Sequence, residues 1–115
     1  MNSLPKSERL SSKKAIGELF DKGRSGVVFP VRYLFIENGK EINSILVSVS
    51  KRHFKRANRR NLIKRRIREA YRINKSPLKG KNLDIALIYI SKEAEEFGAI
   101  EAAIKRIISR LAEGE

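Results

Sequence analysis

Cysteine is absent from this 115-residue chain, and histidine occurs only once, as His53. The absence of cysteine excludes a disulfide framework, a thiolate zinc site and a cysteine nucleophile, and a lone histidine excludes a multi-histidine metal site. No apolar run approaches the ~18–20 residues that span a bilayer, and the first residues lack the apolar stretch of a signal peptide. We therefore expect a cytoplasmic protein without a membrane segment.

Acidic residues are scarce: 13 aspartates and glutamates accompany 26 lysines and arginines, which gives a net charge of +13. The length predicts one domain over residues 1–115, with residues 1–10 irregular. Hydrophobic residues make up 41% of the chain, a fraction typical of globular proteins, so general disorder is not expected.

The positive charge is concentrated in residues 51–75. This segment contains twelve basic residues and one acid, Glu69, and so carries +11 of the total +13. A solvated helix face normally mixes charges of both signs, whereas a block of one sign suits a polyphosphate. We therefore expect nucleic acid as the partner, with an anionic membrane surface as the alternative.

Amphipathic spacing predicts three helices, near residues 12–21, 58–74 and 99–111. Ser12 is the expected N-cap of the first helix, and Gly23 is its expected stop. In the basic helix, Ile63, Ile67 and their apolar neighbours form one stripe that we expect to face the core.

The segments between the helices predict the strands of a mixed sheet. Residues 27–37 are β-branched and aromatic, and Pro30 divides them into two short strands. Residues 44–50 alternate and are expected to pair antiparallel with the preceding strand, while 83–90 has the apolar content of a strand buried on both faces. The predicted order is α-β-β-β-α-β-α in an α+β domain, with a parallel pairing across the basic helix.

No catalytic arrangement is evident in the sequence. His53 has no adjacent carboxylate to orient it, so we interpret it as solvated or in contact with phosphate. Glu93, Glu95, Glu96 and Glu101 are explained by the dipole of the last helix, with weak divalent-ion binding as the alternative. We expect no catalytic residues in the protein, and the sequence locates no metal site.

The basic helix carries cations at intervals of four residues. Guanidinium forks match phosphate oxygens, and like charges four apart destabilise an isolated helix by roughly tenths of a kcal/mol per pair, so we expect an anion to neutralise them. Asn61 can donate and accept hydrogen bonds, and it either binds RNA or caps a backbone group. The ladder and its flank comprise Arg60, Asn61, Lys64, Arg65, Arg68 and Arg72.

Residues 50–69 closely resemble the signature of the bacterial ribonuclease P protein subunit. In that family a basic pair follows a strand, and a loop leads to Arg-Asn-x-Ile/Leu-Lys-Arg-x-x-Arg-Glu/Gln on a helix. The resemblance extends to the N-terminal helix, the strand order and the final helix, and so covers nearly the whole chain. The motif positions are occupied by Arg60, Asn61, Lys64, Arg65 and Arg68.

The resemblance implies the protein subunit of an RNA-catalysed endoribonuclease that removes the 5′ leader from precursor tRNA. The catalyst would be the RNA subunit with its Mg²⁺ ions, and the protein would bind that RNA and the leader and enhance substrate affinity and magnesium-dependent cleavage. The family fold also has a left-handed βαβ crossover, an exception to the usual hand. Outside the ribonucleoprotein the protein is expected to be monomeric.

The resemblance further implies where RNA binds. The leader would lie in a cleft between the sheet and the N-terminal helix, lined by Ile16, Phe20 and a strand residue, Tyr33 or Leu34. Ile16 stands where the family usually has an aromatic, and unpaired bases stack on such rings. Core packing is the alternative for all four residues. The expected RNA-binding residues are Lys51, Arg52, Arg59, Arg60, Asn61, Lys64, Arg65, Arg68 and Arg72.

Two other functions fit a basic domain of this size. The first is another structural RNA-binding protein, such as one of the ribosome. The second is a DNA-binding helix, which is disfavoured because sequence-reading helices display mixed polar side chains for base edges, whereas this ladder is directed almost wholly at phosphates.

Overall fold

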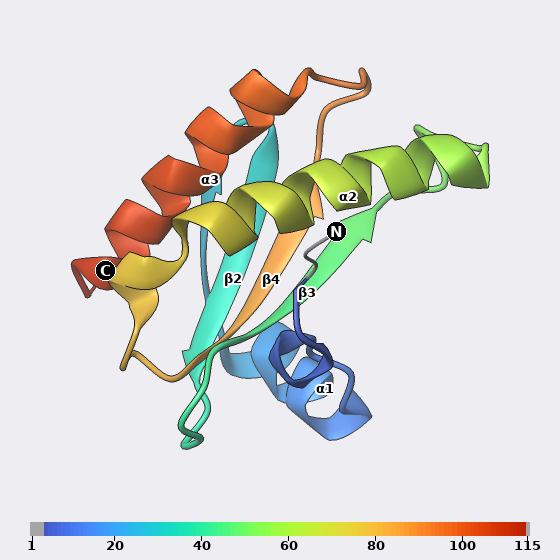
Figure 1. Ribbon diagram of the computed structural model, residues 1–115. Coiled ribbons are helices and arrows are strands. Elements are labelled where there is room, and N and C mark those ends of the chain that lie inside the picture. The colour runs from blue at the N-terminus through green and yellow to red at the C-terminus, as the bar shows by residue number, and fades with distance from the viewer. Residues whose placement is uncertain (1–3, 115) are drawn as a thin grey trace.

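The computed structural model describes residues 4–114. Its order of helices and strands is the predicted α-β-β-β-α-β-α (Figure 1). Short 3₁₀ turns, Lys6–Glu8 and Ser76–Leu78, precede α1 and follow α2. The helices are α1 (Lys13–Lys22), α2 (Ala57–Asn74) and α3 (Phe97–Ala112), and the strands are β1 (Arg24–Val28), β2 (Val31–Glu37), β3 (Ser44–Val49) and β4 (Leu83–Tyr89).

The four strands form one mixed sheet in the order β1-β2-β4-β3. β1 and β4 both pair antiparallel with β2, and β3 pairs parallel with β4. The expectation that 44–50 would pair antiparallel with the preceding strand is therefore wrong. The reason is the strongly apolar β4, which is buried at six of its seven positions and gains most from a central place between β2 and β3.

The β3–α2–β4 unit has the unusual hand that the family resemblance implied. Viewed from the α2 side, both strands run upward and β4 lies to the left of β3 (Figure 1). A chain that rises along β3, returns along the helix in front and rises again on the left makes a left-handed crossover. The parallel pairing that was expected across the basic helix is confirmed.

The helices cover the two faces of the sheet unequally. α2 and α3 pack together on one face, where alternate residues of β4 such as Ile85 and Leu87 enter the main core. The opposite face packs only against α1 and the residues before it, through a small cluster of Leu10, Leu19, Leu34 and Ala86. The short α1 therefore leaves part of this second face uncovered.

The residues before α1 are anchored to the rest of the fold. Leu4 lies in the main core with an exposed fraction of 3%, and the backbone N–H of Leu10 donates to the carbonyl of Ile45 at 2.7 Å. Residues 4–10 contain no α-helix or strand, only the 3₁₀ turn and one isolated bridge, so the expected irregular segment is held in place by two apolar side chains; residues 1–3 of that segment lie outside the described part of the chain.

Both expected ends of α1 are confirmed. The Ser12 hydroxyl accepts from the Ala15 N–H at 3.3 Å, and the Gly23 N–H donates to Leu19 O at 2.9 Å. Across residues 4–114, none of the helices combines the length and apolar content needed to cross a membrane.

Candidate nucleic-acid interface

One stripe of α2 is buried and the rest is cationic. Ile63, Ile67, Ala70 and Tyr71 are all at most 2% exposed, as the predicted stripe required. Their burial against the sheet and α3 fixes the rotation of the helix, so its other side faces outward. The charged side chains of the motif are consequently held on a rigid element rather than on a mobile loop.

Several of the predicted RNA-binding residues have side chains that form no hydrogen bond or ion pair with residues 4–114. Arg65 and Asn61 extend from the outer side of α2. Arg59 lies in the first turn of α2, four residues before Ile63. Lys64 is half-buried beside them. None of these side chains has a hydrogen bond or ion pair with a residue of 4–114. Lys51 and Arg52, in the loop after β3, are exposed as well.

Arg60 has a structural task in addition to its predicted one. Its guanidinium donates to the carbonyls of Phe54 at 2.7 Å and Lys55 at 3.0 Å. These two bonds hold the basic loop against the first turns of α2. The loop cations Lys51 and Arg52 thereby lie next to those of the helix, while RNA binding by Arg60 itself stays a prediction.

Arg72 is also engaged within the protein. Its guanidinium makes a two-pronged ion pair with Glu69, with an Nε–Oε2 distance of 3.1 Å. The hydrogen bond from Arg72 lowers the pKa of Glu69, and the same bond raises the pKa of Arg72. An RNA phosphate at Arg72 would have to displace the only carboxylate in residues 51–75, which makes this end of the ladder its weakest position.

Arg68 differs both from the exposed cations and from those that are bound within the protein. It is half-buried, and this burial, together with the nearby charge of Arg9, lowers the pKa of Arg68. No carboxylate within residues 4–114 pairs with it. Arg68 is therefore a charge that the folded protein leaves uncompensated.

The second face of the sheet carries the predicted leader residues. Phe20 is 49% exposed on α1, one position after the buried Leu19, and Ile16 is half-buried one turn earlier. Leu34 of β2 faces α1 and is 6% exposed, so it forms the floor beneath the helix. Phe20 is thus the aromatic group available at this surface.

Tyr33 does not belong to that surface. It is wholly buried and faces the opposite side of the sheet, where its ring stacks on Phe35 at a centroid distance of 6.1 Å. A side chain at Gly26 would overlap the Tyr33 ring, and glycine at this position leaves the space that the ring needs. The Tyr33 alternative for the leader cleft is therefore wrong, because alternation along β2 places the two residues on opposite faces.

Sequence reasoning missed the neighbours of Leu34 on this face. Arg32, two residues before Leu34, is exposed. The cross-strand partner of Arg32 is Ile88 of β4, which is half-buried. Leu46 of β3 lies on the same face, also half-buried. Had the sequence shown that Leu34 faces α1, the two-residue period of strands would have placed Arg32, Ile88 and Leu46 on the same face of the sheet.

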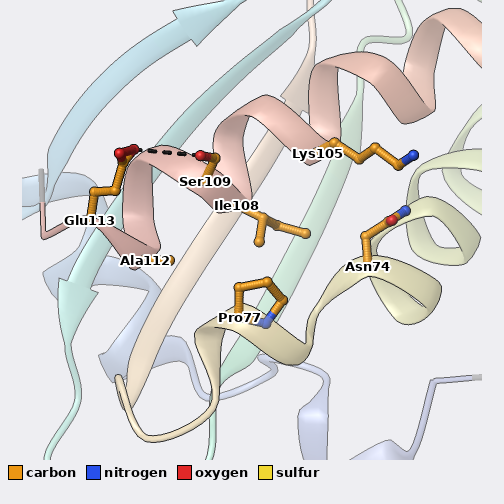
Figure 2. A pocket seen from close by; sticks show the side chains of 7 residues that line it. All are labelled: Asn74, Pro77, Lys105, Ile108, Ser109, Ala112 and Glu113. Carbon is orange, nitrogen blue, oxygen red and sulfur yellow. Dashed lines mark hydrogen bonds between the residues drawn. The ribbon is translucent and has the colours of Figure 1, made fainter.

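On the side of the sheet that α2 and α3 cover, a hollow lies between the end of α2 and α3 (Figure 2). Ile108 and Pro77 face one another across it, and Ser109 donates to Glu113 at 3.4 Å. That bond joins two exposed residues one turn apart at the end of α3 and is explained as a local helix contact, so the hollow does not suggest catalysis. The lining residues are Asn74, Pro77, Lys105, Ile108, Ser109, Ala112 and Glu113.

Arg66 is a motif-region cation whose structural role the sequence did not reveal. Its guanidinium donates to the carbonyl of Glu95 at 2.6 Å. This bond ties α2 to the loop that leads into α3. The basic window therefore mixes exposed cations with cations that hold loops in place.

Comparison with known proteins identifies the family of this chain. Residues 4–112 match the family model for Ribonuclease P. The chain belongs to the Ribonuclease P family. The resemblance inferred from residues 50–69 is thereby confirmed, and family membership implies tRNA processing as the protein component of a ribonucleoprotein.

Curated relatives and solved structures agree with this assignment. The ribonuclease P protein component of Porphyromonas gingivalis is 37% identical over 118 residues, covering 95% of this chain and 86% of the relative. That of Thermotoga maritima is 34% identical over 99 residues, covering 86% and 83%. The solved RNase P protein from Thermotoga maritima superposes with a TM-score of 0.78 at 26% identity, covering 90% of this chain and 96% of that one.

A solved Staphylococcus aureus RNase P protein shows the same fold. Its TM-score is 0.78 at 24% identity, and the match covers 92% of this chain and 96% of that one. At this level of identity the likeness concerns the fold. It supports the α+β architecture with three helices and a mixed four-stranded sheet.

Proposed function

We propose that the protein binds the RNA subunit of ribonuclease P and the 5′ leader of precursor tRNA, and so assists leader removal by the RNA. The observation that supports this most directly is the presence of two different surfaces on opposite sides of the sheet. One is cationic, on α2, and the other has the exposed Phe20 beside a partly uncovered sheet face.

The α2 surface is proposed to bind the RNA subunit through phosphates. Arg59 and Arg65 offer planar forks for bidentate contacts, and Lys64 offers a point charge. Asn61, exposed among them, adds a donor and an acceptor. Lys51 and Arg52 extend this surface into the loop that Arg60 holds against the helix.

The α1 surface is proposed to bind the leader as a single strand. Unpaired bases gain about 1–3 kcal/mol each by stacking on an aromatic side chain, and Phe20 is 49% exposed for such contact. The half-buried Ile16 supplies an apolar contact, the exposed Arg32 adds a charge for the leader backbone, and the buried Leu34 supports α1 from beneath. Aromatic and basic groups together are typical of single-strand binding.

Magnesium is assigned to the RNA subunit in this proposal. Within residues 4–114, histidine, aspartate and glutamate side chains do not gather in threes around a possible ion position. The protein would act by binding and positioning, as a monomer until it joins the RNA. The proposal places it in the cytoplasm with the transcripts it would process.

Reconstitution tests the proposal. The RNA subunit encoded by the same genome is assayed for precursor-tRNA cleavage at moderate magnesium concentration, with and without the protein. The protein should increase cleavage of a substrate with a 5′ leader of several nucleotides more than cleavage of one with a single-nucleotide leader. Equal rates with and without the protein would contradict the proposal, and binding to ribosomal RNA alone would favour the ribosomal alternative.

A further inference from the structure

Residues 4–10, which we name the N-terminal arm, lie between the edge of the sheet and α2. β3 is an edge strand, and the arm pairs with it in parallel at Arg9 and Ile45. On the other side, Lys75 Nζ, just beyond α2, lies 2.6 Å from Glu8 Oε1. The arm is therefore fixed to both elements by backbone and side-chain contacts.

This placement brings an additional cation next to the ladder of α2. Arg68 and Lys75 are seven residues apart and so lie on the same side of the helix, and Glu8, which binds Lys75, is the neighbour of Arg9. Arg9 is exposed and close enough to Arg68 for its charge to oppose ionisation there. The two arginines thus come from the arm and from the helix that the Glu8–Lys75 pair connects.

Neither guanidinium has a counter-charge among the residues that the structure describes. The arm's carboxylate, Glu8, is bound to Lys75, and the only acid of the basic helix, Glu69, is bound to Arg72. Within residues 4–114, Arg9 and Arg68 form no ion pair. The arrangement leaves a pair of like charges that a single anion would neutralise.

Stability alone does not explain Arg9. Leu4 and Leu10 are buried, and the Glu8–Lys75 pair completes the attachment of the arm. Within residues 4–114, the Arg9 side chain forms no ion pair, and its charge opposes that of Arg68. Arginine at this position is explained if a ligand supplies the missing negative charge.

We propose that Arg9 and Arg68 jointly bind one phosphate group of the RNA backbone, so that the N-terminal arm is part of the RNA interface. This inference rests on the proposed function and deepens it by assigning a residue outside α2 and its loop. A phosphate has enough oxygens to accept hydrogen bonds from two guanidinium forks at once. Binding would also remove the repulsion between them.

The main test measures the affinity of the full-length protein for the RNA subunit at several salt concentrations. The variants are Arg9→Gln, Arg68→Gln, the double variant, and Lys6→Gln as the matched control, because Lys6 is an exposed cation of the same arm. Each arginine variant should bind about tenfold more weakly, corresponding to about 1.4 kcal/mol. Lys6→Gln should bind like the wild type.

The double variant distinguishes a shared phosphate from two separate contacts. With one shared phosphate, its loss is smaller than the product of the single losses, and its salt slope falls by about one contact, ~0.7–0.9 units. A loss equal to the product, with a slope lower by two contacts, would overturn the shared site. Wild-type affinity of Arg9→Gln would overturn it as well.

Thermal unfolding of the free protein separates this inference from the proposed function. Without added anion, Arg9→Gln should unfold at the wild-type temperature or above it, because a repulsion is lost. Inorganic phosphate should raise the Tm of the wild type more than that of Arg9→Gln, since a ligand stabilises the state it binds. If the RNA subunit fails to bind the wild type but this difference persists, the anion site stands and the proposed function fails; equal Tm shifts overturn the site.

Discussion

Arg65 and Arg66 are neighbours in the sequence with opposite tasks in the structure. Arg65 is exposed and its side chain makes no hydrogen bond or ion pair with residues 4–114, whereas Arg66 donates to Glu95 O at 2.6 Å. We expect Arg65→Ala to weaken binding of the RNA subunit and to lower its salt slope by about 0.7–0.9 units, with unchanged stability. Filter binding at several salt concentrations measures the effect.

Arg66→Ala is the matched control. It removes the same charge but also a charge-assisted hydrogen bond, so it should lower the free energy of unfolding by about 1 kcal/mol. If both variants affect stability and binding alike, the division between free and anchoring cations is wrong.

Tyr71 offers a second test at the residue scale. Its hydroxyl is buried without a hydrogen-bond partner among the described residues, and burial, aided by the charge of Glu8, raises the pKa of Tyr71. The folded protein therefore holds this proton where the unfolded chain releases it. The stabilising contribution is complete below pH 10, the usual tyrosine pKa, and decreases above it by at most about 1.4 kcal/mol per pH unit.

Tyr71→Phe should remove that decrease while leaving stability at neutral pH unchanged or higher, because an unsatisfied buried hydroxyl contributes nothing favourable. Urea unfolding of both proteins at about pH 7 and about pH 11 measures the difference, and titrations common to both cancel in the comparison. A large loss of stability at neutral pH would show that the hydroxyl has a partner.

At the scale of elements, α1 carries two adjacent side chains that differ in their exposure. Leu19 is wholly buried against the sheet, and Phe20 is 49% exposed. We expect Phe20→Ala to weaken holoenzyme binding of precursor tRNA by about 1–3 kcal/mol through lost stacking, with little effect on mature tRNA. Equilibrium binding of both tRNAs to the reconstituted holoenzyme provides the comparison.

Leu19→Ala is the control for that experiment, since it should instead lower the free energy of unfolding by about 2–5 kcal/mol by opening a cavity. Should Phe20→Ala destabilise the fold to a similar extent, Phe20 belongs to the core and not to the leader surface.

The sequence predicted the elements well and their pairing less well. Periodicity located α2 and α3 because their apolar stripes must face a core, and Ser12 and Gly23 marked the ends of α1. The place of β4 between β2 and β3 depends on contacts between residues far apart in sequence, which no local pattern encodes. Tyr33 and Leu34 were indistinguishable for the same reason, because only the sheet register decides which one meets α1.

The candidate site divides in a similar way. Charge and motif spacing pointed to the cations of α2 as a class, and their RNA binding stays a prediction, yet sequence does not show which of them are used internally. Arg60 and Arg66 hold loops, and Arg72 pairs with Glu69. No RNA-binding role was predicted for Arg9 from the sequence, because Arg9 approaches the basic helix only through the folding of the arm along β3.

For the molecule as a whole, the sheet separates two chemically distinct surfaces. The cations lie mainly on α2 and the loop before it, whereas the exposed ring of Phe20 lies on α1. Phosphate contacts release counterions and weaken steeply with salt, while stacking depends on apolar contact and is affected by salt much less. One chain can therefore hold a large RNA by charge and a single strand by stacking.

This separation predicts different salt dependences for the two binding events. The affinity of the protein for the RNA subunit should fall steeply as salt rises, with a log–log slope of about −0.7 to −0.9 for each phosphate bound. The ratio of precursor to mature tRNA affinity in the assembled holoenzyme should change much less over the same range, because the proposed leader contact on α1 depends on stacking against Phe20. Titrations at three or more salt concentrations, with magnesium held constant, give both slopes. A leader preference that decays as steeply as RNA-subunit binding would show that the leader is held by the α2 cations instead.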